Sequence, residues 1–285
     1  MRIAVVGLGG VGGYLAASFA KAGLDVVGFG RGEHLKVIEQ EGITIVEDEA
    51  TWSVALEAKE LRESEGIFDI VLFCVKSYDL EDAYATISGS LRENSIVLSF
   101  SNGVNNGERL RSLTQVRVLD GAIYILSHIE KPGVIRKKGK VFATVFGGEE
   151  EATAILAKVF EMAHLRYKTP QNIKEALWKK YIFISAFATL TSYYKEPIGA
   201  IYEKHFDEAK RLLTEIAQFA KEHEDIELFD EVQKALQTAK KVPYDSSTSM
   251  ALDFKNGKKT ELESLSGYVQ KPFMQKLYNA LKLKN

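Results

Sequence analysis

A glycine-rich turn near the N-terminus constrains the fold more than any other feature of the chain. An unbroken apolar run at Ile3–Val6 predicts a buried parallel strand, because a parallel strand is covered on both faces. The spacing G-x-G-x-x-G follows, with its glycines at Gly7, Gly9 and Gly12. A helix is predicted over Val11–Ala22 and a second strand over Asp25–Phe29. Strand, motif, helix and strand in about thirty residues indicate a dinucleotide-binding βαβ unit rather than a merely structural glycine turn.

Each glycine of the motif has a physical role in such a unit. Gly7 makes the tight turn, Gly9 lets the backbone approach a pyrophosphate, and Gly12 lets the helix pack closely on the strand. The start of the helix offers free N–H groups and a partial positive charge to the phosphates. The residues expected to bind the cofactor here are Gly7, Leu8, Gly9, Gly10, Val11 and Gly12.

The second predicted strand ends in an arginine where a carboxylate is typical of NAD-binding sites. That carboxylate accepts a hydrogen bond from the ribose 2′-hydroxyl and would repel a 2′-phosphate. The guanidinium of Arg31 can bind a 2′-phosphate through two parallel hydrogen bonds. The sequence therefore favours NADP over NAD, with a solvated Arg31 and a ribose contact from Glu33 as the alternative.

Composition is that of an ordinary enzyme of two domains. The chain has 285 residues, which is long for one hydrophobic core. Its net charge of −2 gives no electrostatic footprint for nucleic acid or for an anionic membrane. Its apolar runs are too short to span a bilayer, and no signal peptide precedes the first strand, so we expect a cytoplasmic location. The single cysteine, Cys74, excludes an intrachain disulfide and a cysteine-based zinc site, and we expect no metal.

The organisation of the chain changes near its middle. Short apolar strands alternate with helices up to about residue 148, at "FDIVLFCVK", "SIVLSF", "VRVLDGAIYIL" and "GVIRKKGKVFATVFG", with a side hairpin at "ITIV" and "TWSVAL". A helix is predicted over 149–165, and helices then fill 173–194, 205–224, 227–240, 246–256 and 260–283. The expected fold class is α/β, with a Rossmann-type doubly wound sheet over 1–168, an all-α domain over 169–285, and a ligand cleft between them.

Two loops after predicted strands carry polar residues. Lys76 follows one buried strand, and Asn102 follows the next in "SFSNGVNN". Ligands bind at the carboxyl ends of the strands in a doubly wound sheet. We therefore expect Lys76 to contact the cofactor and Asn102 to contact cofactor and substrate, although Asn-Gly is also a common plain turn.

The helix predicted to open the α-domain, "EALWKKYIFISAFATLTSYY", is apolar nearly all round and should be buried. Lys179 and Lys180 lie about 100° apart on this helix, so they face different surroundings. One lysine pointing into a cleft would be partly desolvated, and its pKa would move toward neutrality for proton donation. The alternative is that both lysines are solvated.

A third group of polar residues lies in "SSTSMALDFKNGKKTELESLSGYV". Ser249 and Asp253 are i, i+4 neighbours on one helix face, and Asn256-Gly257 predicts a helix end. A new helix at residue 260 would place Glu261 in its first turn, near the break. Ser249, Asp253 and Glu261 are therefore expected to converge, with a solvated helix end as the alternative.

Several stretches distributed over almost the whole chain carry a resemblance to a known family. In order they are "VGLGGVGGYLA" with "RGEHL", "CVKSYD", "SNGVNN", "KPGVIRKKG", "LWKKYIF", "PIGAI" and "SSTSMALDFKNGKKTELESLSGYV". On these stretches the chain resembles the ketopantoate reductase (2-dehydropantoate 2-reductase) family. The resemblance implies NADPH-dependent reduction of ketopantoate, a 2-oxo acid, to pantoate on the route to pantothenate and coenzyme A. It also implies that Lys180 is the catalytic lysine and proton donor, that Glu261 is the catalytic glutamate, and that Ser249 and Asn102 contact the substrate.

The chain departs from the family at two positions of the same helix. Family members carry asparagines four and eight residues after the catalytic lysine, where this chain has Ile184 and Ala188. Apolar side chains cannot hydrogen-bond a substrate hydroxyl. Either Ser185, Ser246 or Thr189 replaces the asparagines, or the pocket accepts a less hydroxylated 2-oxo acid.

Two other functions remain open from the sequence. One is a related NADP-dependent enzyme, such as a β-hydroxyacid dehydrogenase or an imine reductase; Ile184 stands where the former would carry an asparagine after its lysine. The other is a non-catalytic dinucleotide sensor, in which Lys180 and Glu261 are incidental. The expected partner is a small-molecule 2-oxo acid. A homodimer is compatible with the sequence, which carries no evidence on oligomeric state.

Overall fold

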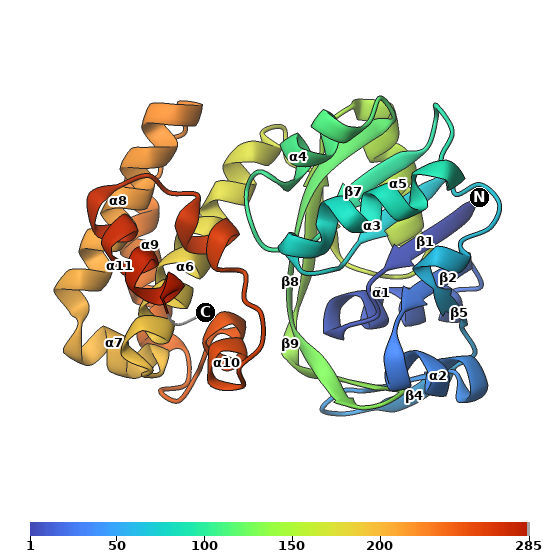
Figure 1. Cartoon of the computed structure of the whole chain (residues 1–285), viewed down its shortest axis with the longest axis horizontal. Coiled ribbons are helices and arrows are strands. Elements are labelled where there is room, and N and C mark those ends of the chain that lie inside the picture. Colours follow the sequence, from blue (N-terminus) through green and yellow to red (C-terminus); the bar gives the residue numbers. More distant parts are fainter. Residues whose placement is uncertain (284–285) are drawn as a thin grey trace. The chain divides into compact units, whose positions relative to one another are not determined.

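The computed structural model describes residues 1–283 and divides the chain into two compact units (Figure 1). The first unit contains Met1–Ser101 and Asn105–Ile173, and the second contains Asn102–Val104 and the chain from Lys174 onward. The division therefore lies a few residues beyond the 168/169 boundary expected from the sequence. It also assigns the short segment that carries Asn102 to the helical unit.

Six parallel strands form the centre of the first unit. Their order across the sheet is β5-β2-β1-β6-β7-β8, which is the 3-2-1-4-5-6 order of a Rossmann fold. The strands are β1 (Arg2–Val6), β2 (Asp25–Gly30), β5 (Glu57–Glu60), β6 (Ile70–Phe73), β7 (Ile96–Ser99) and β8 (Arg117–Lys131). The sequence analysis missed β5, because three of its four residues are charged and no apolar alternation marks it.

Antiparallel strands extend this sheet beyond β8. The long strand β9 (Val134–Gly147) pairs antiparallel with β8, and β3 (Ile43–Val46) runs parallel to β9. The expected side hairpin is confirmed, because β3 pairs antiparallel with β4 (Thr51–Val54). A two-residue strand in the connection between the two units, β10 (Tyr167–Lys168), also pairs with β9.

Helices cover both faces of the sheet, as a doubly wound fold requires. Apolar residues of α1 (Gly10–Lys21), α2 (Gly32–Glu41) and α5 (Glu150–Met162) pack in one core. Residues of α3 (Leu80–Ile87) and α4 (Asn106–Leu113) pack in a separate core against the same strands. Short 3₁₀ turns lie at Leu61–Glu63, Ser77–Asp79 and Ser88–Ser90. The predicted Rossmann-type fold class is confirmed.

The second unit is helical and is built around α6. This helix, Ile173–Tyr194, has the predicted limits and is buried along most of its length. The other helices are α7 (Ile198–Lys204), α8 (Phe206–Glu224), α9 (Phe229–Lys241), α10 (Ser249–Lys255), a π-helix, η4 (Glu263–Gly267), and α11 (Pro272–Lys282). Within the described residues no helix combines the length and the apolar character needed to cross a bilayer.

The prediction of one helix over 260–283 is wrong. The segment contains η4 and α11, with Pro272 as the first residue of α11. Proline suits the first turn of a helix, where its missing N–H leaves no bond unmade. The buried carboxylate of Glu215 on α8 accepts hydrogen bonds from the backbone N–H groups of Phe273 and Met274 and so fixes this start. The prediction also missed α7, which follows Pro197 directly.

Candidate active site

The glycines after β1 are required by close packing at two positions. Gly7 has φ +99°, and a Cβ there would lie 2.9 Å from the carbonyl of Cys74. A Cβ on Gly12 would lie 1.9 Å from the carbonyl oxygen of Gly7. Only glycine therefore allows α1 to approach the turn and β6 this closely.

Gly9 differs, because the space beside it is open. Apart from Gly9 itself and its two chain neighbours, no described residue has a heavy atom within 4 Å of the position that a Cβ on Gly9 would take. Gly9 is the N-cap of α1, whose first turn, within the described residues, contains no acidic side chain. The first N–H groups of a helix have no intrahelical partner, and the N-terminus favours negative charge. The glycine turn is thus a cradle that fits a phosphate group.

His34 holds this cradle in place. Its Nε2 lies 2.9 Å from the carbonyl oxygen of Leu8, and its Nδ1 accepts a hydrogen bond of 3.0 Å from the backbone N–H of Gly133. These partners require a neutral ring with its proton on Nε2, and burial lowers the pKa of His34 accordingly. The sequence analysis gave His34 no role, because its partner Gly133 is 99 residues away.

Arg31 lies where β2 ends and is the N-cap of α2. Its side chain is 88% exposed, and its nearest described acidic partner is Asp79, at 3.7 Å. An exposed guanidinium in a loose ion pair can rearrange to bind an anion. Glu33 lies in the first turn of α2 and is also exposed, so the ribose contact proposed for it stays an alternative. Lys76 follows β6 and immediately precedes the 3₁₀ turn Ser77–Asp79.

Three polar side chains meet in the second unit. The Nζ of Lys180 donates a hydrogen bond of 3.2 Å to Oδ1 of Asn102, and the Nδ2 of Asn102 donates one of 3.3 Å to Oε2 of Glu261. The amide oxygen of Asn102 thus accepts from the Lys180 ammonium, and its amide nitrogen donates to the Glu261 carboxylate. The amide therefore links a cation to an anion. Glu261 is only 4% exposed, so its carboxylate is held in a dry environment.

The two neighbouring lysines of α6 have different surroundings. Lys179 is exposed and forms an ion pair of 2.5 Å with Glu175, one helical turn earlier. Lys180 is half-buried. Burial lowers the pKa of Lys180 from 10.5 to about 8, against the opposing effect of the Glu261 charge. Lys180 is therefore poised to release a proton close to neutral pH.

The position of Glu261 depends on a row of hydroxyl groups on α6. Tyr181 donates to the carbonyl oxygens of Ser264 and Leu265, at 2.9 and 3.0 Å, and Ser185 donates to the second of these at 2.5 Å. Thr189 lies 2.7 Å from the hydroxyl of Ser266. Residues 181, 185 and 189 recur every four positions and so fall on one side of the helix. They fasten η4, which starts two residues after Glu261.

This row corrects one expectation from the sequence. Ser185 and Thr189 were two of the three residues considered as replacements for the missing asparagines. Both are fully buried and make their hydrogen bonds to η4 and to the α6 backbone. Their hydroxyls therefore already have partners inside the second unit, which disfavours the substrate-binding role considered for them. Ile184 is half-buried, one helical turn after Lys180, and Ala188 is buried in the core of the unit.

Ser249 and Asp253 share the short helix α10, as expected. Ser249 is its first residue and is exposed, and Asp253 is half-buried. The hydroxyl of Thr248 caps this helix and lies 2.8 Å from that of Thr191 on α6. Gly257 follows the helix with φ +62°, which confirms the predicted helix end. The convergence of Ser249 and Asp253 with Glu261 stays a prediction.

Comparison with known proteins identifies the family. The family described as "Ketopantoate reductase PanE/ApbA" matches residues 3–150, and its C-terminal part, "Ketopantoate reductase PanE/ApbA C terminal", matches residues 172–281. The chain belongs to the ketopantoate reductase family. It is therefore an oxidoreductase of that family, and the resemblance seen in its sequence motifs is confirmed.

Relatives of this family align with nearly the whole chain. The uncharacterized oxidoreductase YkpB of Bacillus subtilis is 28% identical over 279 residues, which cover 94% of this chain and 91% of the relative. A 2-dehydropantoate 2-reductase of Pyrococcus horikoshii is 27% identical over 281 residues, covering 94% and 89%. The crystal structure of a PanE/ApbA family ketopantoate reductase from Ralstonia eutropha superposes with a TM-score of 0.91 at 28% identity, covering 100% of this chain and 98% of that one.

Proposed function

We propose that the protein reduces ketopantoate to pantoate with NADPH. The observation that carries the proposal is the hydrogen-bonded series Lys180–Asn102–Glu261, which combines a half-buried ammonium with a buried carboxylate. A carbonyl reduction needs a group that stabilises charge on the oxygen and then supplies a proton, and Lys180 fits both requirements. Family membership supports the reaction class.

The first unit offers the groups that a nicotinamide dinucleotide needs. The N-terminus of α1 and the open space beside Gly9 suit its pyrophosphate. Arg31, at the end of β2, suits a 2′-phosphate, and this is the reason for proposing NADP rather than NAD. Lys76 and Asn102 follow neighbouring parallel strands at the edge where ligands of this fold bind. When bound, the cofactor supplies a hydride to C2 of the 2-oxo acid.

Lys180 is proposed to stabilise the developing negative charge and to supply the proton that completes the reduction. Negative charge grows on the carbonyl oxygen as C2 is reduced, and the ammonium of Lys180 stabilises it. Transfer of a proton from Nζ to that oxygen gives the 2-hydroxy acid and leaves a neutral amine. Burial favours this transfer, because it has already lowered the pKa of Lys180 to about 8.

The remaining residues orient the reacting groups. Glu261 attracts the Lys180 ammonium and helps keep Lys180 mostly protonated at neutral pH, since its charge raises the pKa that burial lowers. Asn102 fixes the direction of Nζ through its Oδ1. Ser249 and Asp253, on α10, are proposed to contact the substrate carboxylate or hydroxyl.

The second candidate function is reduction of a less hydroxylated, branched 2-oxo acid. The apolar side chain of Ile184 favours this substrate class. This residue lies one turn after Lys180 on α6 and is half-buried. Because Ser185 and Thr189 bond to η4, they do not supply the hydrogen bonds that an asparagine would make. A pocket lined by Ile184 would accept an isopropyl group as readily as a hydroxymethyl-bearing one.

A cofactor titration followed by a substrate panel tests the proposal. Binding of NADPH and NADH is measured by calorimetry, and NADPH oxidation is then followed with ketopantoate, 2-oxoisovalerate, pyruvate and an aromatic 2-oxo acid. Turnover with ketopantoate supports the first candidate, and a preference for 2-oxoisovalerate supports the second. Tight NADPH binding without turnover of any 2-oxo acid would indicate a dinucleotide sensor and refute the proposal.

A further inference from the structure

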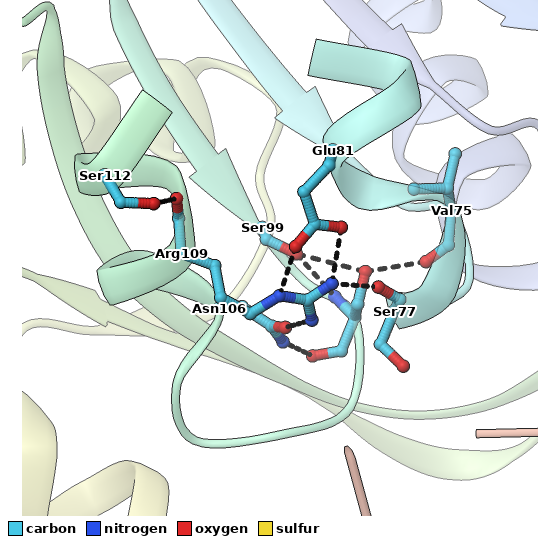
Figure 2. Close-up of polar contacts among 8 residues, drawn as sticks. Val75, Ser77, Glu81, Ser99, Asn106, Arg109 and Ser112 are labelled. Carbon is cyan, nitrogen blue, oxygen red and sulfur yellow. Dashed lines mark hydrogen bonds and ion pairs between the residues drawn. The ribbon is translucent and has the colours of Figure 1, made fainter. Parts of the chain in front are cut away.

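A partly buried ion pair joins the two helices that follow β6 and β7 (Figure 2). Arg109 of α4 and Glu81 of α3 pair through two parallel hydrogen bonds, from Nε to Oε1 at 2.7 Å and from Nη2 to Oε2 at 2.6 Å. Hydrogen bonding to Arg109 lowers the pKa of Glu81, so its carboxylate is ionised throughout the neutral range. Such a bidentate pair fixes both the distance between the two side chains and their orientation.

The same guanidinium binds the segment after β6 directly and the loop before α4 through Asn106, the first residue of α4. Its Nη2 also donates to the carbonyl oxygen of Ser77 at 2.6 Å, in the loop after β6. Its Nη1 donates to Oδ1 of Asn106 at 3.0 Å, and the Nδ2 of Asn106 donates to the carbonyl oxygen of Ser101 at 3.0 Å. Asn106 is 5% exposed, so its amide is oriented by these bonds rather than by water.

Ser101 is held by two further hydrogen bonds. Its hydroxyl donates to the carbonyl oxygen of Val75 at 2.6 Å and accepts from the hydroxyl of Ser99 at 3.0 Å. The loop from 101 to 105 has neither helical nor strand conformation. Side-chain hydrogen bonds therefore determine where Ser101 lies, and Asn102 is the next residue in the chain.

We propose that Arg109 is a positioning residue, which acts through Asn106 and Ser101 to hold Asn102 where it bonds Lys180 and Glu261. The inference rests on the proposed function, in which Asn102 orients the proton donor. It adds a residue whose described hydrogen bonds go to Glu81, Asn106 and Ser77. Arg109 also fixes the loop that begins at Val75 and carries Lys76, so one side chain sets both strand-end loops.

Lysine cannot replace Arg109 in this role. The network uses Nε, Nη1 and Nη2 of a planar group, directed at Glu81, Asn106 and Ser77. A lysine ammonium is a single point charge and cannot form the fork to Glu81 while also reaching the other two acceptors. Arg109→Lys, which keeps only the positive charge, should therefore fail to hold Asn102 in position.

The test compares Arg109→Gln and Arg109→Lys with a matched control. Arg117 forms a similar forked pair with Glu149, and its side chain is 15% exposed against 24% for Arg109. Arg117 begins β8, whereas Arg109 acts at the opposite ends of β6 and β7, so Arg117→Gln removes a forked pair, together with a contact to Glu151, away from the loops. The full-length variants are compared in kcat, in KM, and in amide hydrogen exchange of a peptide covering 100–106.

We expect Arg109→Gln to lower kcat by roughly tenfold to a hundredfold, because a displacement of about 1 Å at a catalytic group has this effect. Exchange in the 100–106 peptide should rise at least several-fold, Arg109→Lys should show most of both effects, and Arg117→Gln should show neither. An Arg109→Gln enzyme with wild-type kcat, or with unchanged loop exchange, would overturn the inference.

A second variant and the hydrogen-exchange measurement allow the proposal to be tested even if Arg109→Gln does not fold or the wild type is inactive. If Arg109→Gln does not fold, Glu81→Gln breaks the same fork and is expected to give a smaller loss of kcat with the same rise in exchange; unchanged exchange would count against the inference. If the wild-type protein reduces no 2-oxo acid, the proposed function fails. Loop exchange in the variants still decides whether Arg109 holds the segment that carries Asn102.

Discussion

The pH dependence of turnover is the sharpest prediction from the site. Burial moves the pKa of Lys180 from 10.5 to about 8, which at about 1.4 kcal/mol per pH unit makes proton release about 3 kcal/mol easier. Reduction requires the ammonium form, so kcat/KM should be constant below pH 7 and fall about tenfold per pH unit well above pH 8. The assay is the initial rate of NADPH oxidation, with the 2-oxo acid well below its KM, across pH 6–10.

Substitutions at the two lysines separate the proton donor from its neighbour. Lys180→Met should lower kcat by roughly 10²–10⁴ and abolish the basic limb of the profile. Lys180→Arg should keep a positive charge but remain slow at every pH, because a guanidinium does not release a proton in this range. Lys179→Met, which breaks only the exposed pair with Glu175, should resemble the wild type. NADPH affinity should change little in all three.

Several results would refute this reasoning. A basic limb that persists in Lys180→Met would mean that another group titrates. Loss of activity in Lys179→Met, with Lys180→Met active, would reverse the assignment of the two lysines. A wild-type profile that is flat to pH 10 would mean that Lys180 does not act as the acid.

The same lowered pKa predicts an effect on stability. The folded protein binds fewer protons than the unfolded chain between pH 8 and 10.5, so the contribution of Lys180 to the free energy of unfolding rises with pH across this window. At pH 7 the buried charge costs up to about 3 kcal/mol. Lys180→Met should therefore unfold at a higher denaturant concentration than the wild type at pH 7, and the advantage should vanish near pH 10.5. An equal advantage at both pH values would contradict this origin.

Three further predictions concern cofactor, substrate and fold. Arg31→Ala should weaken NADPH binding by roughly tenfold to a hundredfold and leave NADH binding nearly unchanged, because a charge-assisted contact contributes about 1.5–3 kcal/mol; equal wild-type calorimetric affinities for NADH and NADPH would refute the assignment. Measured kcat/KM values for ketopantoate and 2-oxoisovalerate should differ far less than the roughly 10⁴–10⁵-fold of a hydroxyl-binding site, and strong rejection of 2-oxoisovalerate would show that hydrogen-bonding groups other than Ile184 select the substrate. Gly12→Ala should prevent tight NADPH binding and lower the melting temperature, since its Cβ would lie 1.9 Å from the Gly7 carbonyl oxygen; a stable variant with normal binding would contradict the packing argument.

Local patterns in the sequence were sufficient for much of this fold. The turn at Gly7–Gly12 and the limits of α6 depend on spacing within one element. The helical spacing of Lys179 and Lys180 indicated only that their surroundings differ, and the family resemblance was needed to select Lys180. The fold class followed from the alternation of strands and helices. These features need no knowledge of distant partners.

Features that depend on distant partners escaped the sequence analysis. His34 depends on Gly133, and Arg109 on Glu81, pairs that no periodic pattern connects. The interruption between η4 and α11 is fixed by Glu215, which lies on another helix. Strand β5 owes its place to pairing with β2, since its own residues are mostly charged. In each case a tertiary contact, rather than a local propensity, selects the conformation.

The row of hydroxyl groups on α6 has a consequence for how the substrate specificity of such a protein can evolve. Tyr181, Ser185 and Thr189 fasten η4, while Lys180 and Ile184 occupy the adjacent row of the same helix. A change at position 184 alters the side chain next to the proposed proton donor and leaves the hydrogen bonds from Tyr181, Ser185 and Thr189 to η4 in place. Under the proposed function, structural support and substrate choice therefore lie in different rows of α6, so that single substitutions at position 184 could change the preferred 2-oxo acid without releasing η4.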